Sequence, residues 1–186
     1  MDLQIRLATK EDLPEILELQ AQSLRSLAIG YYKPTQIDCL VQSQGTARSR
    51  GFEEKNEVIY LASTNGKLVG LATLLTWSPR IGGLYVHPNF VRQGIALQLL
   101  SKIEEAAMIR RYRKLKVMSA LSAIKLYEKA GYRRIRSTHF RLGKEVIQCL
   151  EMTKTLRNES AQETQQGSFF SSLRQLYFNW REWLSF

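Results

Sequence analysis

The sequence has few cysteines and histidines and no long hydrophobic run. Its 186 residues include only Cys39, Cys149, His87 and His139, and their spacing matches neither a disulfide framework nor a zinc site. A transmembrane helix would need about 18 or more consecutive apolar residues, and no such stretch is present. The first residues also lack the basic-then-apolar layout of a secretory signal. These absences predict one cytoplasmic catalytic or binding domain without a metal.

The charge of the chain is strongly unbalanced. Lys and Arg number 27 against 17 Asp and Glu, which gives a formal net charge of +10. Residues 157–186 carry three arginines and three glutamates, so the whole excess lies in residues 1–156. A basic surface attracts polyanions, although a solvated basic face explains the charge equally well. Aromatic residues do not alternate with the basic ones, which argues against nucleic-acid binding.

Hydrophobic periodicity predicts strands that alternate with helices in the second half of the chain. Thr9 is the expected N-cap of the first helix, and Asn65-Gly66 is the expected turn of a hairpin. Residues 43–56 are polar and predict a loop. The predicted order is βααββββαβαββ, with strands at Gln4–Leu7, Glu57–Ser63, Lys67–Trp77, 81–86, Lys114–Ser119, Tyr132–Leu142 and Val146–Met152, and helices over 10–27, from Pro34, over Ile95–Tyr112 and over Ser122–Ala130.

The most informative segment runs from Leu84 to Ala96. A branched, aromatic strand ends at His87-Pro88, and a helical pattern starts near Ile95 after Gly94. A strand–loop–helix turn of this kind points backbone N–H groups at one place, where the helix dipole adds positive potential. Such a nest binds phosphate or pyrophosphate.

The last thirty residues differ in composition from the rest. Residues 157–167 are rich in Asn, Ser, Gln, Thr and Glu and predict a polar linker. Residues 168–186 place aromatic side chains at helical spacing and predict an amphipathic helix. Three interpretations of this helix stay open: packing on its own domain or on a second subunit as a dimer contact, peripheral contact with a membrane, or disorder.

Three segments together resemble the GNAT superfamily of N-acetyltransferases, in a broad bacterial-type subgroup. The resemblance covers residues 3–156. It implies an α+β fold, in which helices flank a central, mostly antiparallel twisted sheet with one parallel, splayed pair. One position departs from the family pattern, since Val91 stands where the loop usually has a polar residue. The segments are Leu84–Ala96, Ser122–Tyr132, and Ser137-Thr138-His139 with Gly143, Cys149 and Met152.

The resemblance also implies a donor, acetyl-CoA, and residues that would hold it. Tyr127 would be the general acid that protonates the departing thiolate, although a helix tyrosine packed on the sheet is the alternative. Ser122 would lie near the cofactor, or else cap its helix. The backbone of the strand would bind the pantetheine arm and the thioester, and the loop would bind the pyrophosphate. These cofactor-binding residues are Leu84, Tyr85, Val86, Arg92, Gln93, Gly94, Ile95, Ala96 and Ser122.

The general base and the acceptor stay open. The strand before the loop begins Arg80-Ile81-Gly82-Gly83 and carries no carboxylate, so the candidates are Glu57, Tyr31, Tyr32, His139 or a chain of water molecules. His87 is expected to be structural. Cys149 has no evident basic partner, which favours direct attack in a ternary complex.

The predicted function is therefore transfer of an acetyl group to a primary amine on a small molecule, a peptide or a protein. The alternative is a non-catalytic acyl-CoA sensor or interaction module on the same fold, which Val91 and the missing strand carboxylate suggest.

Overall fold

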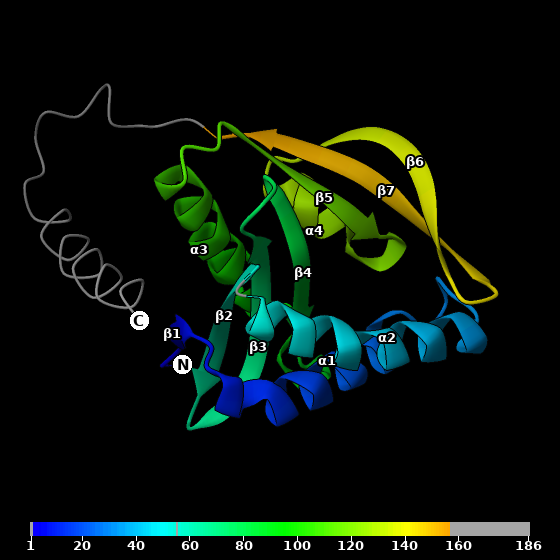
Figure 1. Ribbon diagram of the computed structural model, residues 1–186, viewed down its shortest axis with the longest axis horizontal. Helices are drawn as coiled ribbons and strands as arrows, with labels where there is room; N and C mark the ends of the chain where they lie inside the picture. The colour runs from blue at the N-terminus through cyan, green and yellow to red at the C-terminus, as the bar shows by residue number, and fades with distance from the viewer. Residues whose placement is uncertain (1, 55, 157–186) are drawn as a thin grey trace, which may run out of the picture. The chain divides into compact units, whose positions relative to one another are not determined.

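The computed structural model describes residues 2–54 and 56–156, with the backbone alone for residues 46–53, and these residues form one compact unit (Figure 1). The predicted order of strands and helices is confirmed. The elements are β1 (Gln4–Leu7), α1 (Leu13–Leu27), α2 (Pro34–Glu53), β2 (Glu57–Thr64), β3 (Lys67–Leu75), β4 (Arg80–Val86), α3 (Ile95–Ile109), β5 (Lys114–Ala120), α4 (Ile124–Lys129), β6 (Arg133–Leu142) and β7 (Glu145–Thr155), with short 3-10 turns at Lys10–Asp12, Pro88–Phe90 and Leu121–Ala123.

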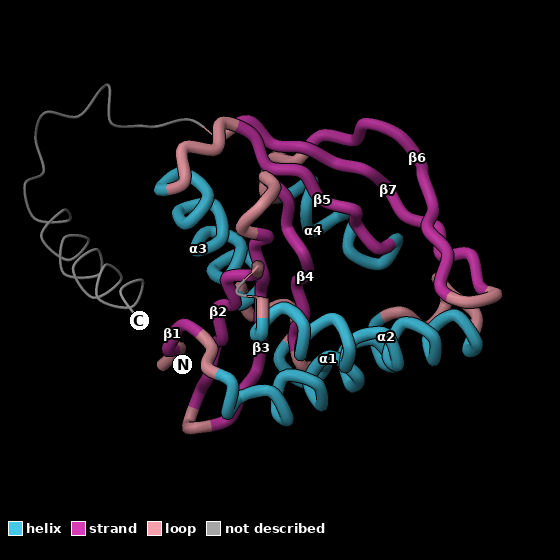
Figure 2. The backbone as a smooth tube through the Cα atoms, viewed as in Figure 1, coloured by secondary structure: helices cyan, strands magenta, loops and turns pink. Residues whose placement is uncertain are grey.

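The strands form one mixed sheet of the predicted class (Figure 2). Its seven strands lie in the order β1-β2-β3-β4-β5-β7-β6. Every neighbouring pair is antiparallel except β4 and β5, which run parallel. A parallel connection needs a crossover, and α3 supplies it between these two strands.

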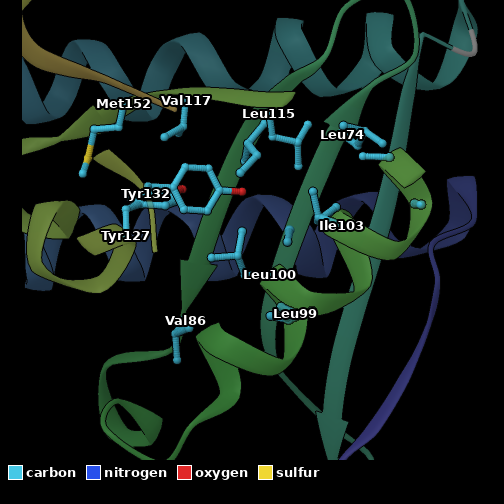
Figure 3. Close-up of a cluster of buried hydrophobic side chains, with 14 of the residues drawn as sticks. Leu74, Val86, Leu99, Leu100, Ile103, Leu115, Val117, Tyr127, Tyr132 and Met152 are labelled. Carbon is cyan, nitrogen blue, oxygen red and sulfur yellow. The ribbon is translucent and has the colours of Figure 1, made fainter. Parts of the chain in front are cut away.

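Two separate apolar clusters attach helices to opposite faces of the sheet. On one face, Ile16 and Leu19 of α1 pack on Ile59, Leu61 and Leu71. On the other face, α3 buries an apolar stripe against the sheet together with Tyr127 of α4 and Tyr132 (Figure 3). We call these the α1 face and the α3 face.

Gly70 on β3 allows α3 to approach the sheet closely. A Cβ at this position would lie 2.9 Å from Leu99 Cδ1 and 3.0 Å from Ile95 Cγ2. Since real Cβ atoms essentially never come that near, a larger residue at position 70 would push the helix away. The start of α3, where the loop of interest ends, is therefore held tightly on the sheet.

The predicted loop over residues 43–56 is wrong, because α2 continues to Glu53. One of the polar residues that suggested a loop, Gln44, contacts a second helix instead. Gln44 accepts a hydrogen bond at 3.0 Å from the Gln20 amide of α1, and Gln20 is fully buried. In this part of α2, a polar contact with α1 therefore takes the place of the apolar stripe that a surface helix normally shows.

The predicted linker over 157–167 and the helix over 168–186 lie outside the described residues. Within the part of the chain that is described, no helix is long and apolar enough to cross a membrane.

Candidate active site along strand β4

Strands β4 and β5 pair only where they begin. The parallel ladder joins Arg80 to Lys116 and Ile81 to Val117, and the Lys116 N–H donates to the Pro79 carbonyl at 2.9 Å. Beyond Ile81 the two strands diverge (Figure 1). The other edge of β4 stays paired with β3 as far as Val86. The backbone groups of β4 that point toward β5 are therefore available to a ligand between the strands.

The side chains of Leu84, Tyr85 and Val86 leave this backbone edge accessible. Leu84 and Val86 pack into the core on the α3 face, and Tyr85 packs on the α1 face. The Tyr85 hydroxyl donates to Gln44 Oε1 at 3.3 Å. The structure places all three on the open part of β4, where only main-chain N–H and C=O groups can face the gap.

The loop after β4 gathers N–H groups at the start of α3. Arg92 and Gly94 have positive φ angles of 63° and 83°, and Gly94 is the N-cap of the helix. The Gly94 carbonyl accepts from the N–H groups of Leu97 and Gln98, at 3.1 Å each. Within the described residues no acceptor is found for the N–H groups of Gln93 to Ala96. Such a nest at a helix N-terminus suits an anion.

The phenol of Tyr127 lies in the core on the α3 face, beside Tyr132 (Figure 3). Tyr127 is 3% exposed and its ring packs edge-on against Tyr132 with centroids 5.4 Å apart. Burial raises the pKa of Tyr127 well above its ordinary value, and the phenol of Tyr85 raises it further. The Tyr127 hydroxyl is therefore protonated over the whole physiological pH range.

Ser122 does not cap a helix, so that alternative is wrong. It lies inside the 3-10 turn Leu121–Ala123, whose N-cap is Ala120, and Ala123 is the N-cap of α4. Neither cap involves a side-chain hydrogen bond. The structure places Ser122 after the end of β5, on the side of the gap opposite Tyr85.

Tyr32 and His139 are badly placed to act as the base. The Tyr32 hydroxyl donates to the Gln148 carbonyl at 2.7 Å and accepts from the Leu121 N–H at 2.9 Å, so it ties the α1–α2 connection to the sheet. Burial raises the pKa of Tyr32, which disfavours the phenolate form that a base would need. His139 lies exposed on the outer strand β6, paired with Gln148. Tyr31 is exposed at 54% on the α1–α2 connection.

Glu57 is the candidate that reaches the open strand. The sheet register shifts between Thr73 and Leu74 of β3, which leaves Gly82 as a bulge in β4. A Cβ at Gly82 would lie 2.5 Å from Thr73 Oγ1 and 3.2 Å from Glu57 Oε1. The carboxylate of Glu57 and the hydroxyl of Thr73 therefore flank the bulge on the α1 face, where Gly82 is exposed.

Thr73 is a functional candidate that the sequence did not suggest. Its side chain is fully buried, and its hydroxyl has no hydrogen-bond partner within the described residues. A buried polar atom without a partner is destabilising, so one beside an open strand suggests a position that a ligand fills. The paired glycines Gly82-Gly83 within a strand were the available signal for this bulge.

Cys149 and His87 have structural surroundings. Cys149 is 3% exposed, its thiol donates to the Thr138 carbonyl at 3.5 Å, and burial raises its pKa, which opposes the thiolate form. His87 Nδ1 accepts from the Asn89 N–H at 3.2 Å and thereby caps the turn after β4. Among the described residues no group of three His, Cys, Asp or Glu side chains is arranged to hold a metal.

This fold, with a parallel pair that opens above an N–H-rich loop, defines an acetyltransferase of the GNAT type. Residues 30–156 match the family model described as an acetyltransferase (GNAT) domain, so the chain belongs to this family. A comparison with curated proteins finds no match.

Solved structures give the same fold. The GCN5-related N-acetyltransferase of Rhodopseudomonas palustris, also described as a class-II aminotransferase, has a TM-score of 0.78 and 23% identity over 84% of this chain and 97% of its own. PaiA N-acetyltransferase of Thermoplasma acidophilum, in complex with coenzyme A, has a TM-score of 0.69 and 17% identity over 83% of this chain and 99% of its own. YncA of Salmonella typhimurium, with its cofactor acetyl-CoA, has a TM-score of 0.60 and 18% identity over 88% of this chain and 99% of its own.

Proposed function

We propose that this protein transfers the acetyl group of acetyl-CoA to a primary amine by direct attack. The observation that carries the proposal is the open edge of β4, which joins the N–H-rich loop at one end to the Glu57–Gly82 bulge at the other. Neighbours of the same fold hold coenzyme A or acetyl-CoA. Acetyl-CoA would supply the activated acetyl thioester.

The main chain of one continuous segment would hold the donor. N–H groups from Gln93 to Ala96 have no acceptor in the described residues and suit a pyrophosphate. The exposed edge of β4 at Leu84–Val86 suits an amide-bearing arm that extends the sheet. A backbone donor aimed at the developing oxyanion is typically worth about 3–4 kcal/mol.

Glu57 would accept the proton that the amine loses. An alkylammonium resembles Lys, with a pKa near 10.4, and must become neutral before it can attack. The Glu57 carboxylate lies beside the bulge in β4, on the α1 face, and Gly82 contributes no side chain to block it. The hydroxyl of Thr73, without a protein partner among the described residues, would accept from the same nitrogen.

Tyr127 would donate the proton that the leaving thiolate needs. Its pKa is raised by burial and by Tyr85, so its hydroxyl stays protonated until a strong base forms next to it. No covalent intermediate on the protein is required, because the buried thiol of Cys149 is held as a thiol.

The first test is donor binding followed by turnover. Acetyl-CoA should bind in a calorimetric titration, and a panel of primary amines should release free coenzyme A detectably by a thiol reagent. Binding without release from any amine would favour the sensor function. No binding at millimolar acetyl-CoA would overturn both functions.

The second test is Tyr127→Phe, with Tyr132→Phe as the matched control. Both phenols are buried in the same cluster, and only Tyr127 is assigned to proton transfer. Tyr127→Phe should lower kcat by about 10²-fold or more, as expected when a general acid is lost, with the acetyl-CoA dissociation constant nearly unchanged. Equal kcat values for the two variants would remove Tyr127 from this role.

A further inference from the structure

Three cations surround one carboxylate where β4 and β5 begin. Arg136 Nε donates to Glu151 Oε2 at 2.8 Å, and Lys116 Nζ lies 3.8 Å from Glu151 Oε1. Arg80, the ladder partner of Lys116, also lowers the pKa of Glu151 through its charge. We call Arg80, Lys116, Arg136 and Glu151 the cationic cluster. One carboxylate cannot neutralise three cations, so the cluster keeps a positive charge.

The cationic cluster lies on the same face of the sheet as Glu57. Ile81 points into the core on the α3 face, so its neighbour Arg80 points to the α1 face. Gly82 points to the α1 face as well, because its Cβ would meet Thr73 Oγ1 and Glu57 Oε1. Arg80 and Gly82 are therefore successive positions on one face of β4, about 6 to 7 Å apart along the strand.

The phosphates of the donor cannot account for these cations. The N–H-rich loop follows Val86 at the far end of β4, and Arg80 is the first residue of the strand. Six residues of strand separate them, which corresponds to about 20 Å. The positive charge of the cationic cluster therefore faces the acceptor end of the candidate site.

We propose that the acceptor is a small zwitterionic amine, whose ammonium group lies beside Glu57 and whose carboxylate binds the cationic cluster. The inference rests on the proposed acetyl transfer and assigns its substrate class. Because Arg80 and Gly82 are successive positions on one face of β4, and Glu57 lies against Gly82, one small molecule can reach both Glu57 and the cationic cluster. Glu151 orients Arg136 and Lys116, while Arg80 has no hydrogen bond to a carboxylate within the described residues.

The first experiment compares acceptors of graded length. The acceptors are 4-aminobutyrate, 5-aminopentanoate and 6-aminohexanoate, each beside its neutral carboxamide, and coenzyme A release gives kcat/KM. The best carboxylate should exceed its carboxamide by about tenfold, because a charge-assisted hydrogen bond is replaced by a neutral one. The advantage should fall as salt concentration rises. Equal kcat/KM for every acid and amide pair would overturn the proposal.

The second experiment removes the cations one at a time. Arg80→Gln and Lys116→Gln should each lower the acid-to-amide ratio of kcat/KM about threefold or more, and the double variant should lower it further. Arg141→Gln is the matched control, because Arg141 faces the opposite side of the sheet. Its neighbour Phe140 pairs with Ile147, which packs against α2, and side chains of adjacent residues in a strand point to opposite faces. A ratio that is unchanged in the double variant, or that falls equally in Arg141→Gln, would overturn the assignment.

A binding measurement separates the two proposals. Calorimetry with 5-aminopentanoate and the enzyme alone should give weaker binding for the Arg80→Gln/Lys116→Gln variant than for the wild type. This readout does not require acetyl-CoA. If no amine is acetylated but the binding difference is present, the acetyltransferase proposal fails and the anion subsite stands. If amides are acetylated well and the binding difference is absent, the subsite fails and the acetyl transfer stands.

Discussion

The two ends of strand β4 are built in different ways. At its C-terminal end, the candidate donor site consists of main-chain groups from one continuous segment, Leu84–Ala96. At its N-terminal end, the candidate acceptor site consists of side chains from six strands, with Glu57 on β2, Thr73 on β3, and the cationic cluster on β4, β5, β6 and β7 beyond them. A site made from backbone tolerates side-chain changes, whereas a site made from side chains changes with each substitution.

Val91 illustrates the tolerance of the donor end. It replaces a polar residue of the family loop, and it lies in extended backbone just before Arg92 turns into the left-handed region. The N–H groups that face the loop come from Gln93 onward, so the side chain at position 91 does not supply them. The acceptor end is made of side chains, so a substitution there removes one of its groups directly.

The largest effect is expected from Glu57→Gln. Loss of the general base should lower kcat/KM by about 10²-fold or more near neutral pH, and the loss should shrink as the pH rises toward the pKa of the amine, because more of the amine is then neutral without a base. Acetyl-CoA affinity should not change. Initial rates over a range of pH, with Glu11→Gln on the first turn before α1 as control, measure both effects. A Glu57→Gln variant that keeps the wild-type pH profile would leave the base to water.

Gly82→Ala should separate the two ends. The new Cβ would lie 2.5 Å from Thr73 Oγ1 and 3.2 Å from Glu57 Oε1, so these groups must move. We expect the KM for the amine to rise about tenfold, as misplaced groups of this kind commonly cause, while the acetyl-CoA dissociation constant stays close to that of the wild type. Gly82→Ala/Thr73→Ser keeps the clashing hydroxyl and Gly82→Ala/Thr73→Ala removes it. Thr73→Ala alone measures the loss of the hydroxyl, and a KM for Gly82→Ala/Thr73→Ala no higher than that of Thr73→Ala would confirm that the clash is the cause.

The difference between the ends explains how far the sequence could be interpreted. The element order, the GNAT fold and the loop over Leu84–Ala96 were predictable because each depends on neighbouring residues: periodicity, a glycine, a strand followed by a helix. The acceptor end depends on sheet register, which brings Arg80, Lys116 and Glu151 together from strands far apart in the chain. A one-residue shift in register would send these side chains to the other face, and no local pattern fixes it.

The extent of α2 shows the same limit within one helix. Its C-terminal part was interpreted as a loop because the residues around Gln44 show no apolar residues at helical spacing. Only the packing of α2 on α1 gives that residue a buried partner, Gln20. Ser122 failed as a helix cap for a related reason, since a 3-10 turn comes between β5 and α4 and makes Ala123 the N-cap of α4.

Gly94→Ala should weaken the donor end without touching the acceptor end. No atom lies within 4 Å of the new Cβ, so the effect comes from the left-handed backbone with φ of 83°. That conformation costs a non-glycine residue about 1–2 kcal/mol, which corresponds to a five- to thirtyfold rise in the acetyl-CoA dissociation constant if the loop relaxes. The KM for the amine should stay the same. Calorimetry and steady-state rates give the two numbers, with Gly143→Ala, also at positive φ but in the β6–β7 turn, as control.

The smallest effect is expected at a site that belongs to neither end. Asp12 accepts two hydrogen bonds from Arg6, at 2.7 and 2.6 Å, and this contact lowers the pKa of Asp12 to about 2 from its ordinary 3.8. A carboxylate with a lowered pKa in the folded state stabilises the protein above its unfolded pKa, and the contribution disappears as the pH falls through the folded pKa.

Asp12→Asn should therefore lower the free energy of unfolding at neutral pH by at most about 1 kcal/mol, since solvent screens this pair, and the difference should shrink steadily as the pH falls toward 2. Urea denaturation of both proteins from pH 7 downward measures it. Acetyl-CoA affinity and amine KM should both be unchanged. A change in either quantity would mean that a loss of overall stability alters binding at both ends of β4. The stability change caused by Gly82→Ala and by Gly94→Ala would then have to be measured and subtracted before their separate effects on the two ends are compared.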